Sequence, residues 1–354
     1  MTVTISDVAE RAGVSATTVS LSFKKGTRIS EATRQRVLKA ARDVGYIPNQ
    51  FARRLRLGRS KLIALIVPEI DTPFISDIVT TVENKLAVDG YNVLIFSTFR
   101  DCDLERRAAQ AAMELSVEGV IVAACEGEND GLRQMCESEC PVVYIDSIPK
   151  REGQCGYVIN DMTATGCIGT EYLLRLGHRR ILLVDGPERH RDFSSFRRIA
   201  EAYQATLEKH GLDYDPRLVV SQGLYIDDGF KAVERALDED VEFTAVFAIS
   251  DWVALGAIQC IESHGLRVPD DVSVLGIDNS AMAGLNRVNL TTIEMYNPHG
   301  NGESMGDAAA RMLLQVLGSG GGEAHVCESV VFKPRLVLRG SCRQLDPARS
   351  PAAK

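Results

Sequence analysis

The sequence predicts two unlike parts: a small all-α helix-turn-helix head at residues 1–48, and an α/β body with two doubly wound parallel-sheet subdomains. Apolar residues recur at helical spacing in the head, whereas from Lys61 short apolar runs alternate with helical patterns. Charge divides at the same place, because residues 1–60 contain 12 Lys and Arg against 4 Asp and Glu, and the other residues contain 28 against 44. A basic head on an acidic body indicates that only the head binds nucleic acid, since Lys and Arg displace counterions from phosphate.

The head is expected to form three short helices. Gly13 follows the first apolar helical face and suits the positive-φ turn that ends a helix. Ser15 can cap a second helix with Val19 and Phe23 facing inward, and Ser30 begins a third. Two short helices about a tight turn form a helix-turn-helix, whose second helix enters the major groove of DNA. An ordinary three-helix bundle has the same periodicity but needs no such excess of positive charge.

The linker at residues 49–60 mixes arginines with leucines. Asn49 can cap a helix of about two turns that Gly58 ends, and a helix this short is marginal in water. Leu55 and Leu57 have little visible core to join. A helix that folds only on DNA, with a leucine wedged into the minor groove, explains the mixture, and a solvated basic linker is the alternative.

Composition narrows the classes of function. The 354 residues are 45% hydrophobic and 25% charged, which is ordinary for a globular chain of two or three domains. No apolar run reaches about 18 residues and no signal-peptide pattern is present, so we expect a cytoplasmic protein with no membrane part. The nine cysteines lack a CxxC pair and the six histidines lack metal-ligand spacing, so no metal or other cofactor is expected, and nothing selects a redox-active cysteine. No P-loop, nucleophile elbow or dinucleotide fingerprint occurs, and no enzyme is predicted.

The body is expected to repeat a strand-and-helix pattern twice. In the first run, strands at 62–67, 91–96, 120–122 and 142–145 alternate with helices at 74–88 and 104–115. In the second, strands at 181–184, 218–220, 245–249 and 272–277 alternate with helices at 163–176, 196–210, 228–238 and 252–264. A strand at 290–293, a helix to about residue 317 that returns to the first subdomain, and a last strand at 330–338 follow. The expected boundaries are an N-subdomain of about 61–158 and 294–325, a C-subdomain of about 159–293 and 326–342, and a flexible tail at 343–354.

Polar residues follow several of the predicted strands. Because ligands bind outside the carboxyl ends of strands in open α/β sheets, this rule selects Asp71 to Phe74, Asp146, Ser250 to Trp252, and Asp278. Carboxylates that bind hydroxyls, with an aromatic ring to cover a flat face, suit a sugar or a nucleoside-like molecule. Helix caps and turns are the alternative role for each aspartate.

Several short motifs occur in order along the chain. In the head they are Asp7-Val8-Ala9, Ala12-Gly13-Val14-Ser15, Thr18-Val19-Ser20 and Gly45-Tyr46-Ile47-Pro48-Asn49. In the body they include Gly177-His178-Arg179-Arg180-Ile181, Pro269-Asp270-Asp271-Val272, Gly276-Ile277-Asp278-Asn279 and Pro334-Arg335-Leu336. Together they resemble the lactose/galactose-repressor (LacI/GalR) family of bacterial transcriptional regulators. The resemblance spans about residues 3 to 340, and it implies a core similar to periplasmic sugar-binding proteins that forms a homodimer.

The resemblance also implies which residues contact DNA. Ala16, Thr17 and Leu21 would contact bases, and Leu55 would be the minor-groove wedge. Leu21 departs from the family, where many members have a longer polar or basic side chain. The complete expected set is Ser15, Ala16, Thr17, Thr18, Ser20, Leu21, Arg28, Asn49, Ala52, Arg53 and Leu55.

The expected ligand contacts combine the strand-end rule with the resemblance, which itself implies Asp146, Ser250 and Asp278. The family's ligand-binding arginine has no direct equivalent, because Ile199 stands three residues before Ala202-Tyr203. Arg197 and Arg198 lie two residues and one residue before that position, so either one of them substitutes, with Arg197 favoured, or the ligand differs. The complete expected set is Phe74, Asp146, Arg197, Ser250, Asp251, Trp252 and Asp278.

The predicted function is a ligand-responsive transcriptional regulator, most simply a repressor, acting as a homodimer on a near-palindromic operator in double-stranded DNA. Its effector would be a small sugar or nucleoside-like metabolite. One alternative is a regulator of the same fold without a small-molecule effector, and another is a solute-binding protein. A solute-binding protein needs no basic helix-turn-helix, so the head counts against that alternative.

Overall fold

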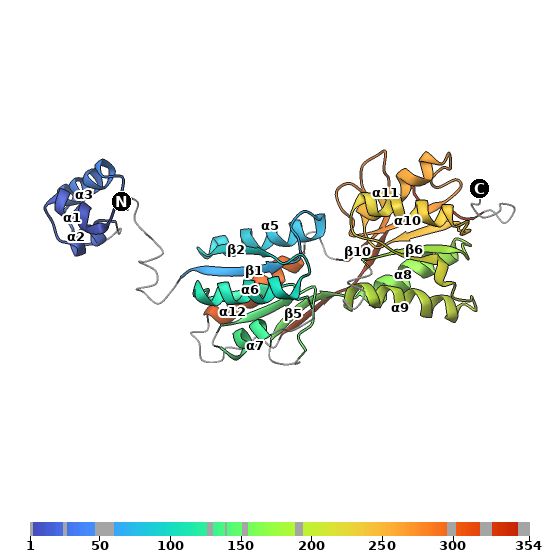
Figure 1. Cartoon of the computed structure of the whole chain (residues 1–354), viewed down its shortest axis with the longest axis horizontal. Helices are drawn as coiled ribbons and strands as arrows, with labels where there is room; N and C mark the ends of the chain where they lie inside the picture. The colour runs from blue at the N-terminus through green and yellow to red at the C-terminus, as the bar shows by residue number, and fades with distance from the viewer. Residues whose placement is uncertain are drawn as a thin grey trace. The chain divides into compact units, whose positions relative to one another are not determined.

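The computed structural model describes residues 3–23, 27–46, 60–125, 130–138, 140–150, 155–187, 194–295, 302–318 and 328–345. Contacts divide the chain into two compact units, Met1–Ser60 and Lys61–Lys354 (Figure 1). The predicted DNA contacts Asn49, Ala52, Arg53 and Leu55 all lie outside the described residues. None of the described helices is both long enough and apolar enough to cross a membrane.

Three helices enclose the small core of the head: α1 (Ile5–Ala12), α2 (Ala16–Ser22) and α3 (Glu31–Asp43). Val8, Val19 and Val37 each contribute one fully buried side chain, one from each helix. Gly13 has a φ of 63°, a left-handed conformation that costs glycine little, and it directs the chain from α1 into α2. The predicted helix-turn-helix head is thereby confirmed.

The N-subdomain is built on a parallel sheet with strand order β11-β5-β4-β3-β1-β2. Its strands are β1 (Leu62–Val67), β2 (Asn92–Ser97), β3 (Gly119–Val122), β4 (Val142–Ile145), β5 (Gly156–Asn160) and β11 (Ser329–Phe332), and its helices are α5 (Pro73–Val88), α6 (Cys102–Glu114), α7 (Asp130–Glu137) and α12 (Met305–Gly318). All six residues of β1 are buried, because alternate side chains join the cores on opposite faces of the sheet. The continuous apolar run at 62–67 is therefore explained by helices on both faces.

The C-subdomain repeats this plan, with strand order β12-β10-β9-β8-β6-β7. Its strands are β6 (Ile181–Asp185), β7 (Val219–Ser221), β8 (Ala245–Ala248), β9 (Ser273–Ile277), β10 (Thr291–Glu294) and β12 (Arg335–Val337), and its helices are α8 (Met162–Arg175), α9 (Ser194–Lys209), α10 (Ile226–Asp238), α11 (Asp251–Ser263) and the 3₁₀ turn η2 (Pro216–Leu218). A Cβ at Gly256 would overlap the backbone carbonyl of Ile226, so only glycine lets α10 and α11 pack this closely. In both sheets the first strand lies between its two successors, which creates a topological switch point.

In the described part of the body, the chain passes between the subdomains three times: from β5 to α8, from β10 to α12, and from β11 to β12. The return of α12 to the N-subdomain agrees with the sequence prediction. The prediction of one final strand at 330–338 within the C-subdomain is wrong. Instead, β11 pairs in parallel with β5, and β12 pairs antiparallel with β10. Pro334 lies between β11 and β12, and because proline has no N–H it interrupts a strand at this point.

Two elements, α7 and β5, were not predicted from the sequence. The helix has 8 residues and the strand has 5, so neither is long enough to show a clear period. Both lie in the N-subdomain, where β5 fills the position between β4 and β11.

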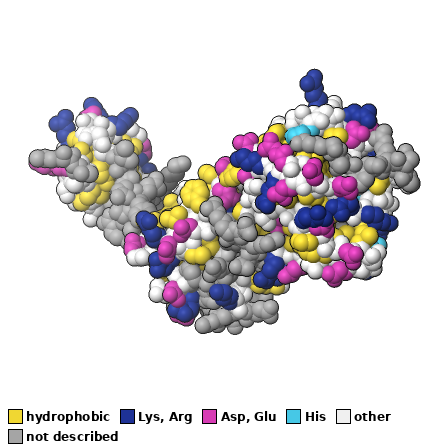
Figure 2. Space-filling model, turned by 45° about the vertical axis from the view of Figure 1, so that its right-hand side comes forward, with side chains coloured by type: hydrophobic (Ala, Val, Ile, Leu, Met, Phe, Trp, Pro, Cys, Tyr) yellow, Lys and Arg dark blue, Asp and Glu magenta, His cyan; other side chains and the backbone are white. Residues whose placement is uncertain are grey.

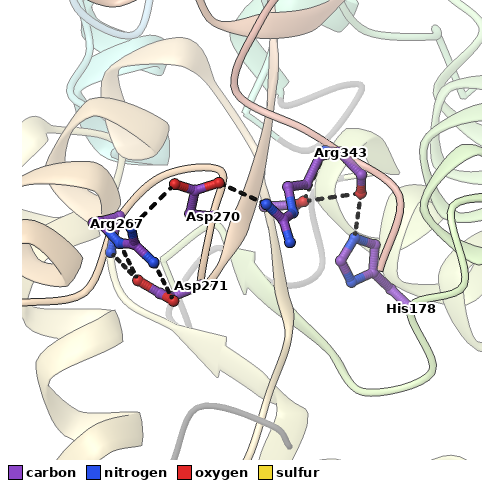
Figure 3. A network of polar contacts seen from close by, with 6 residues as sticks. His178, Arg267, Asp270, Asp271 and Arg343 are labelled. Carbon is purple, nitrogen blue, oxygen red and sulfur yellow. Dashed lines mark hydrogen bonds and ion pairs between the residues drawn. The ribbon is translucent and has the colours of Figure 1, made fainter. Parts of the chain in front are cut away.

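A network of polar contacts fixes the end of the described chain to the C-subdomain (Figure 3). The imidazole Nε2 of buried His178 lies 3.2 Å from the carbonyl oxygen of Arg343, whose guanidinium is 2.6 Å from the Asp270 carboxylate. The Leu345 N–H donates to a carbonyl at the C-terminal end of α8 over 2.7 Å. The expectation of a flexible tail from residue 343 is therefore wrong for residues 343–345, and the rest of that tail lies outside the described residues.

This network makes truncation a test of the tail. Ending the chain after Cys342 removes the Arg343 carbonyl that faces Nε2 of buried His178 and the Arg343 guanidinium that pairs with Asp270, a loss of about 1–3 kcal/mol. We expect the thermal midpoint of the body to fall by about 2–4 °C for each kcal/mol lost. Ending the chain after Leu345 keeps every described contact and should leave the midpoint unchanged. Equal midpoints for the two truncations, measured by circular dichroism, would contradict an anchored tail.

Candidate functional site

The head presents the first turn of α2 to solvent. Ser15, Ala16 and Thr17 are exposed, whereas Val19 on the opposite side is fully buried. The Ser15 hydroxyl accepts the Thr18 N–H at 3.2 Å and so caps the helix. Small polar side chains at an accessible, capped helix start are what a helix in the major groove requires.

The other described members of the expected DNA-contacting set surround this turn. Thr18, Ser20 and Leu21 are partly buried, and Arg28 is exposed between α2 and α3. Figure 2 shows Lys and Arg side chains on the described surface of the head. Arg28 is therefore an accessible cation beside α2, whereas Leu21 has an apolar side chain.

A cleft in the body lies where the carboxyl ends of the strands of both sheets meet. Its lining follows nine different strands, as the switch-point rule predicts. The lining residues are Glu69, Thr72, Pro73, Phe74, Ile75, Arg100, Asp146, Met162, Ser195, Phe196, Leu224, Ile249, Ser250, Asp251, Trp252, Asp278, Ser280 and Met295. The cavity volume is about 70 Å³, enough for several waters.

Six of the seven expected ligand contacts line this cleft: Phe74, Asp146, Ser250, Asp251, Trp252 and Asp278. Arg197 does not, and that expectation is corrected by the structure. Its side chain is 54% exposed and its guanidinium lies 3.5 Å from Glu201 on the same helix. Phe196 takes the cleft-facing position at the start of α9, so the next residue points away around the helix.

The arginine in the cleft is Arg100, which sequence reasoning missed. It follows β2, and its guanidinium is 2.8 Å from the Glu69 carboxylate in a pair that is largely buried. The same guanidinium carbon lies 5.4 Å from the centre of the Phe196 ring, close enough for a cation–π contact. The strand-end rule could have found Glu69 and Arg100, which lie two and three residues past β1 and β2.

Among the described residues, four carboxyl side chains line the cleft, but only one arginine does. Burial raises the pKa of Asp146 to about 7, with Arg100 opposing the rise and Glu69 adding to it. Burial also raises the pKa of Asp278 well above its usual range, and Asp251 and Asp146 add to that shift. Asp278 has a φ of 107° and is only 8% exposed. A buried carboxylate in a strained backbone indicates a binding role rather than a stabilising one.

Asp251 differs from Asp146 and Asp278, because both of its carboxylate oxygens already accept hydrogen bonds within the protein. It accepts the Thr292 hydroxyl at 2.6 Å and the Ser280 N–H at 2.7 Å, which ties α11 to β10 and to the loop after β9. Burial raises the pKa of Asp251 to about 6 in spite of these bonds. Ser250, not Asp251, caps α11 by accepting the Val253 N–H at 3.2 Å.

Other polar atoms in the cleft are unused within the described structure. The indole Nε1 of Trp252 and the hydroxyl of Ser280 are buried without a hydrogen-bond partner. Together with the carboxylates of Asp146 and Asp278, they offer donors and acceptors to a ligand. No group of three or more His, Cys, Asp or Glu in the described ranges is arranged to hold a metal ion.

A contact joins the two subdomains at the mouth of the cleft. The Tyr225 hydroxyl, at the start of α10, donates to the Asp71 carboxylate at 3.2 Å, and the tyrosine ring packs against Trp252 at 6.3 Å. Tyr225 is 41% exposed, so this contact is weak and can be exchanged for water.

A helix-turn-helix head on a body with a two-subdomain ligand cleft defines a DNA-binding transcriptional regulator. Residues 4–49 match the model for bacterial regulatory proteins of the lacI family, and residues 170–342 match a periplasmic binding protein-like domain. The HTH-type transcriptional repressor PurR of Histophilus somni (strain 129Pt) is 30% identical over 343 residues, which are 97% of this chain and 99% of the relative.

Two solved structures are similar over nearly the whole chain. The transcriptional regulator CelR–cellobiose complex has a TM-score of 0.69 and 28% identity, with 96% of this chain and 99% of that chain covered. The lac repressor dimer bound to operator and the anti-inducer ONPF has a TM-score of 0.76 and 25% identity, with 97% and 100% covered. The chain therefore belongs to the LacI family of transcriptional regulators, and it is not an enzyme.

The raised pKa of Asp278 predicts a pH-dependent stability. A carboxyl whose folded pKa exceeds its unfolded value of about 3.9 stabilises the fold below that pH, and this stability is lost as pH rises through the folded pKa. Asp278→Asn removes the loss, so its thermal midpoint should exceed that of the unchanged chain by a few degrees at pH 7–8. The difference should vanish near pH 4.

The control is Asp213→Asn. Asp213 is exposed in the loop that follows α9, and it is not among the residues that line the cleft. Its midpoint should match the unchanged chain at every pH. If Asp278→Asn lowered the midpoint at pH 7–8, the carboxylate would be part of the framework of the fold.

Proposed function

We propose that this chain is a repressor that binds a near-palindromic operator as a homodimer and responds to a small polar effector in the cleft. The observation that supports this most is the pairing of an accessible, capped α2 with a cleft at the carboxyl ends of both sheets. The relatives support the same proposal: PurR is named a repressor, and the lac repressor structure is a dimer on its operator. Such a protein acts where the bacterial chromosome lies, in the cytoplasm.

The proposed link between cleft and operator is the linker at residues 49–60. Its leucines and arginines suit a helix that forms on DNA, with Leu55 wedged into the minor groove. An effector that changes the relation between the subdomains would change the folding of this helix, and the two affinities are then reciprocally linked.

The proposed effector is uncharged or positively charged and has hydroxyl or amine groups. The described lining has Glu69, Asp146, Asp251 and Asp278 against one arginine, and that arginine is paired with Glu69. Donors on the ligand would satisfy Asp146 and Asp278, while Trp252 and Phe74 would cover an apolar face. A sugar or a nucleoside fits this description, and the cellobiose complex of CelR supports the first.

Genomic selection tests the central claim. Purified protein should retain DNA fragments that share one pseudo-palindrome, at near-physiological salt because affinity depends on salt. Leu55→Ala should lower affinity for that site about tenfold, roughly 1.4 kcal/mol, while Leu57→Ala has a smaller effect. Failure to enrich any site, both with and without cell extract, would refute the proposal that this chain is a repressor.

Trp252 gives a direct assay for the effector, since it is the chain's one tryptophan. Uncharged or amine-bearing sugars and nucleosides should change its fluorescence, and their phosphorylated counterparts should not. Asp278→Asn should weaken such binding at least tenfold, the cost of about 1.4 kcal/mol from one lost hydrogen bond in a buried site. Binding of only the phosphorylated compounds would refute the proposed chemistry. Operator affinity that changes only with a protein from extract would favour a regulator without a small-molecule effector.

A further inference from the structure

Two cysteines from separate elements of the N-subdomain meet beside its core. Cys136 lies on the last turn of α7, and its Sγ is 3.1 Å from the Sγ of Cys155, which directly precedes β5. Cys155 is 7% exposed, while Cys136 is only partly buried. A disulfide needs the sulfurs about 2.05 Å apart, so a movement of about 1 Å would bring them to bonding distance.

A third cysteine lies nearby but does not share this geometry. The Sγ of Cys140 is directed at the carbonyl oxygen of Val117, at 3.9 Å. Burial raises the pKa of Cys140 to about 12, and Cys136 adds to the rise. Cys140 therefore remains a thiol at neutral pH, and a thiol is a poor nucleophile.

We propose that Cys136 and Cys155 form a reversible oxidation site, at which a hydroperoxide generates a disulfide within one chain. The more accessible Cys136 thiolate attacks the peroxide, breaks its O–O bond, and becomes a sulfenic acid while hydroxide leaves. Cys155 then attacks the sulfenic sulfur, the S–S bond forms, and the sulfenic oxygen leaves as water with the Cys155 proton. Two thiols lose two electrons in total, and one hydrogen peroxide becomes two waters.

The position of this pair connects it to the cleft. The chain between the two cysteines contains β4 and Asp146, and the Asp146 N–H donates to the Val158 carbonyl of β5 at 2.9 Å. A disulfide would fix the start of β5 to α7. The other end of β5 leads into α8, one of the passages between the subdomains. The oxidation site therefore lies on the elements that hold one wall of the cleft.

The test uses the full chain, fully reduced and then freed of reductant. It is treated with hydrogen peroxide, alkylated, digested with trypsin and analysed by mass spectrometry. Cleavage after Arg133, Lys150, Arg151 and Arg175 should yield residues 134–150 linked to residues 152–175. Dithiothreitol should separate these peptides again. We expect this link to be at least tenfold more abundant than any other disulfide.

Each linked peptide contains a second cysteine, Cys140 or Cys167, so variants assign the bond. Cys136→Ser and Cys155→Ser should each abolish the link, whereas Cys140→Ser and Cys167→Ser should retain it. Cys102→Ser, which removes an exposed thiol, should also retain it. A link that survives Cys155→Ser, over-oxidation of Cys136 without a link, or a pair still reduced when Cys102 is oxidised would each overturn the proposal.

Discussion

Carboxylates held out of water at the carboxyl ends of β4, β8 and β9 are the constraint on which the body depends. A buried charge is costly unless it is paired or hydrogen-bonded. Asp251 meets this requirement within the protein, through Thr292 and the loop after β9. Within the described residues, Asp146 has only the nearby charge of Arg100, and Asp278 has no cation among its causes of pKa shift, so the apolar cores of both subdomains must hold them in place. A ligand that donates hydrogen bonds relieves this cost, and its binding therefore favours the conformation in which the carboxylates converge.

The connections between the subdomains suit this coupling. Each subdomain has its own sheet covered by helices, and two of the passages between them, from β5 to α8 and from β11 to β12, are no longer than two residues. A change in the angle between two such bodies is absorbed by a few residues at the passages, as in other hinged domains. The Tyr225–Asp71 contact at the mouth is partly solvated, so opening the cleft loses little there.

The positive charge of the cleft comes from a different element than the resemblance implied. The resemblance led us to expect an arginine on α9, but the cleft-facing position at the start of that helix is occupied by Phe196. The cation comes from Arg100 after β2, where it is paired with Glu69 and covered by the phenylalanine ring. The charge of the site therefore follows from contacts between different strand ends.

The sequence by itself determined the helix-turn-helix head, the alternation of strands and helices, and eight of the eighteen residues that line the cleft. These features depend on local periodicity and on which residues follow a strand, and both are visible along the chain. For the linker at 49–60, the sequence alone supports the predicted helix. Tertiary structure alone decided the division of the last strand into β11 and β12, the anchoring of Arg343 by His178, the pairing of Arg100 with Glu69, and the meeting of Cys136 with Cys155. The last three of these join residues that different strands and helices bring together, so no local pattern could reveal them. For the divided strand, Pro334 marks the break locally, but only the fold shows that its two halves pair in different sheets.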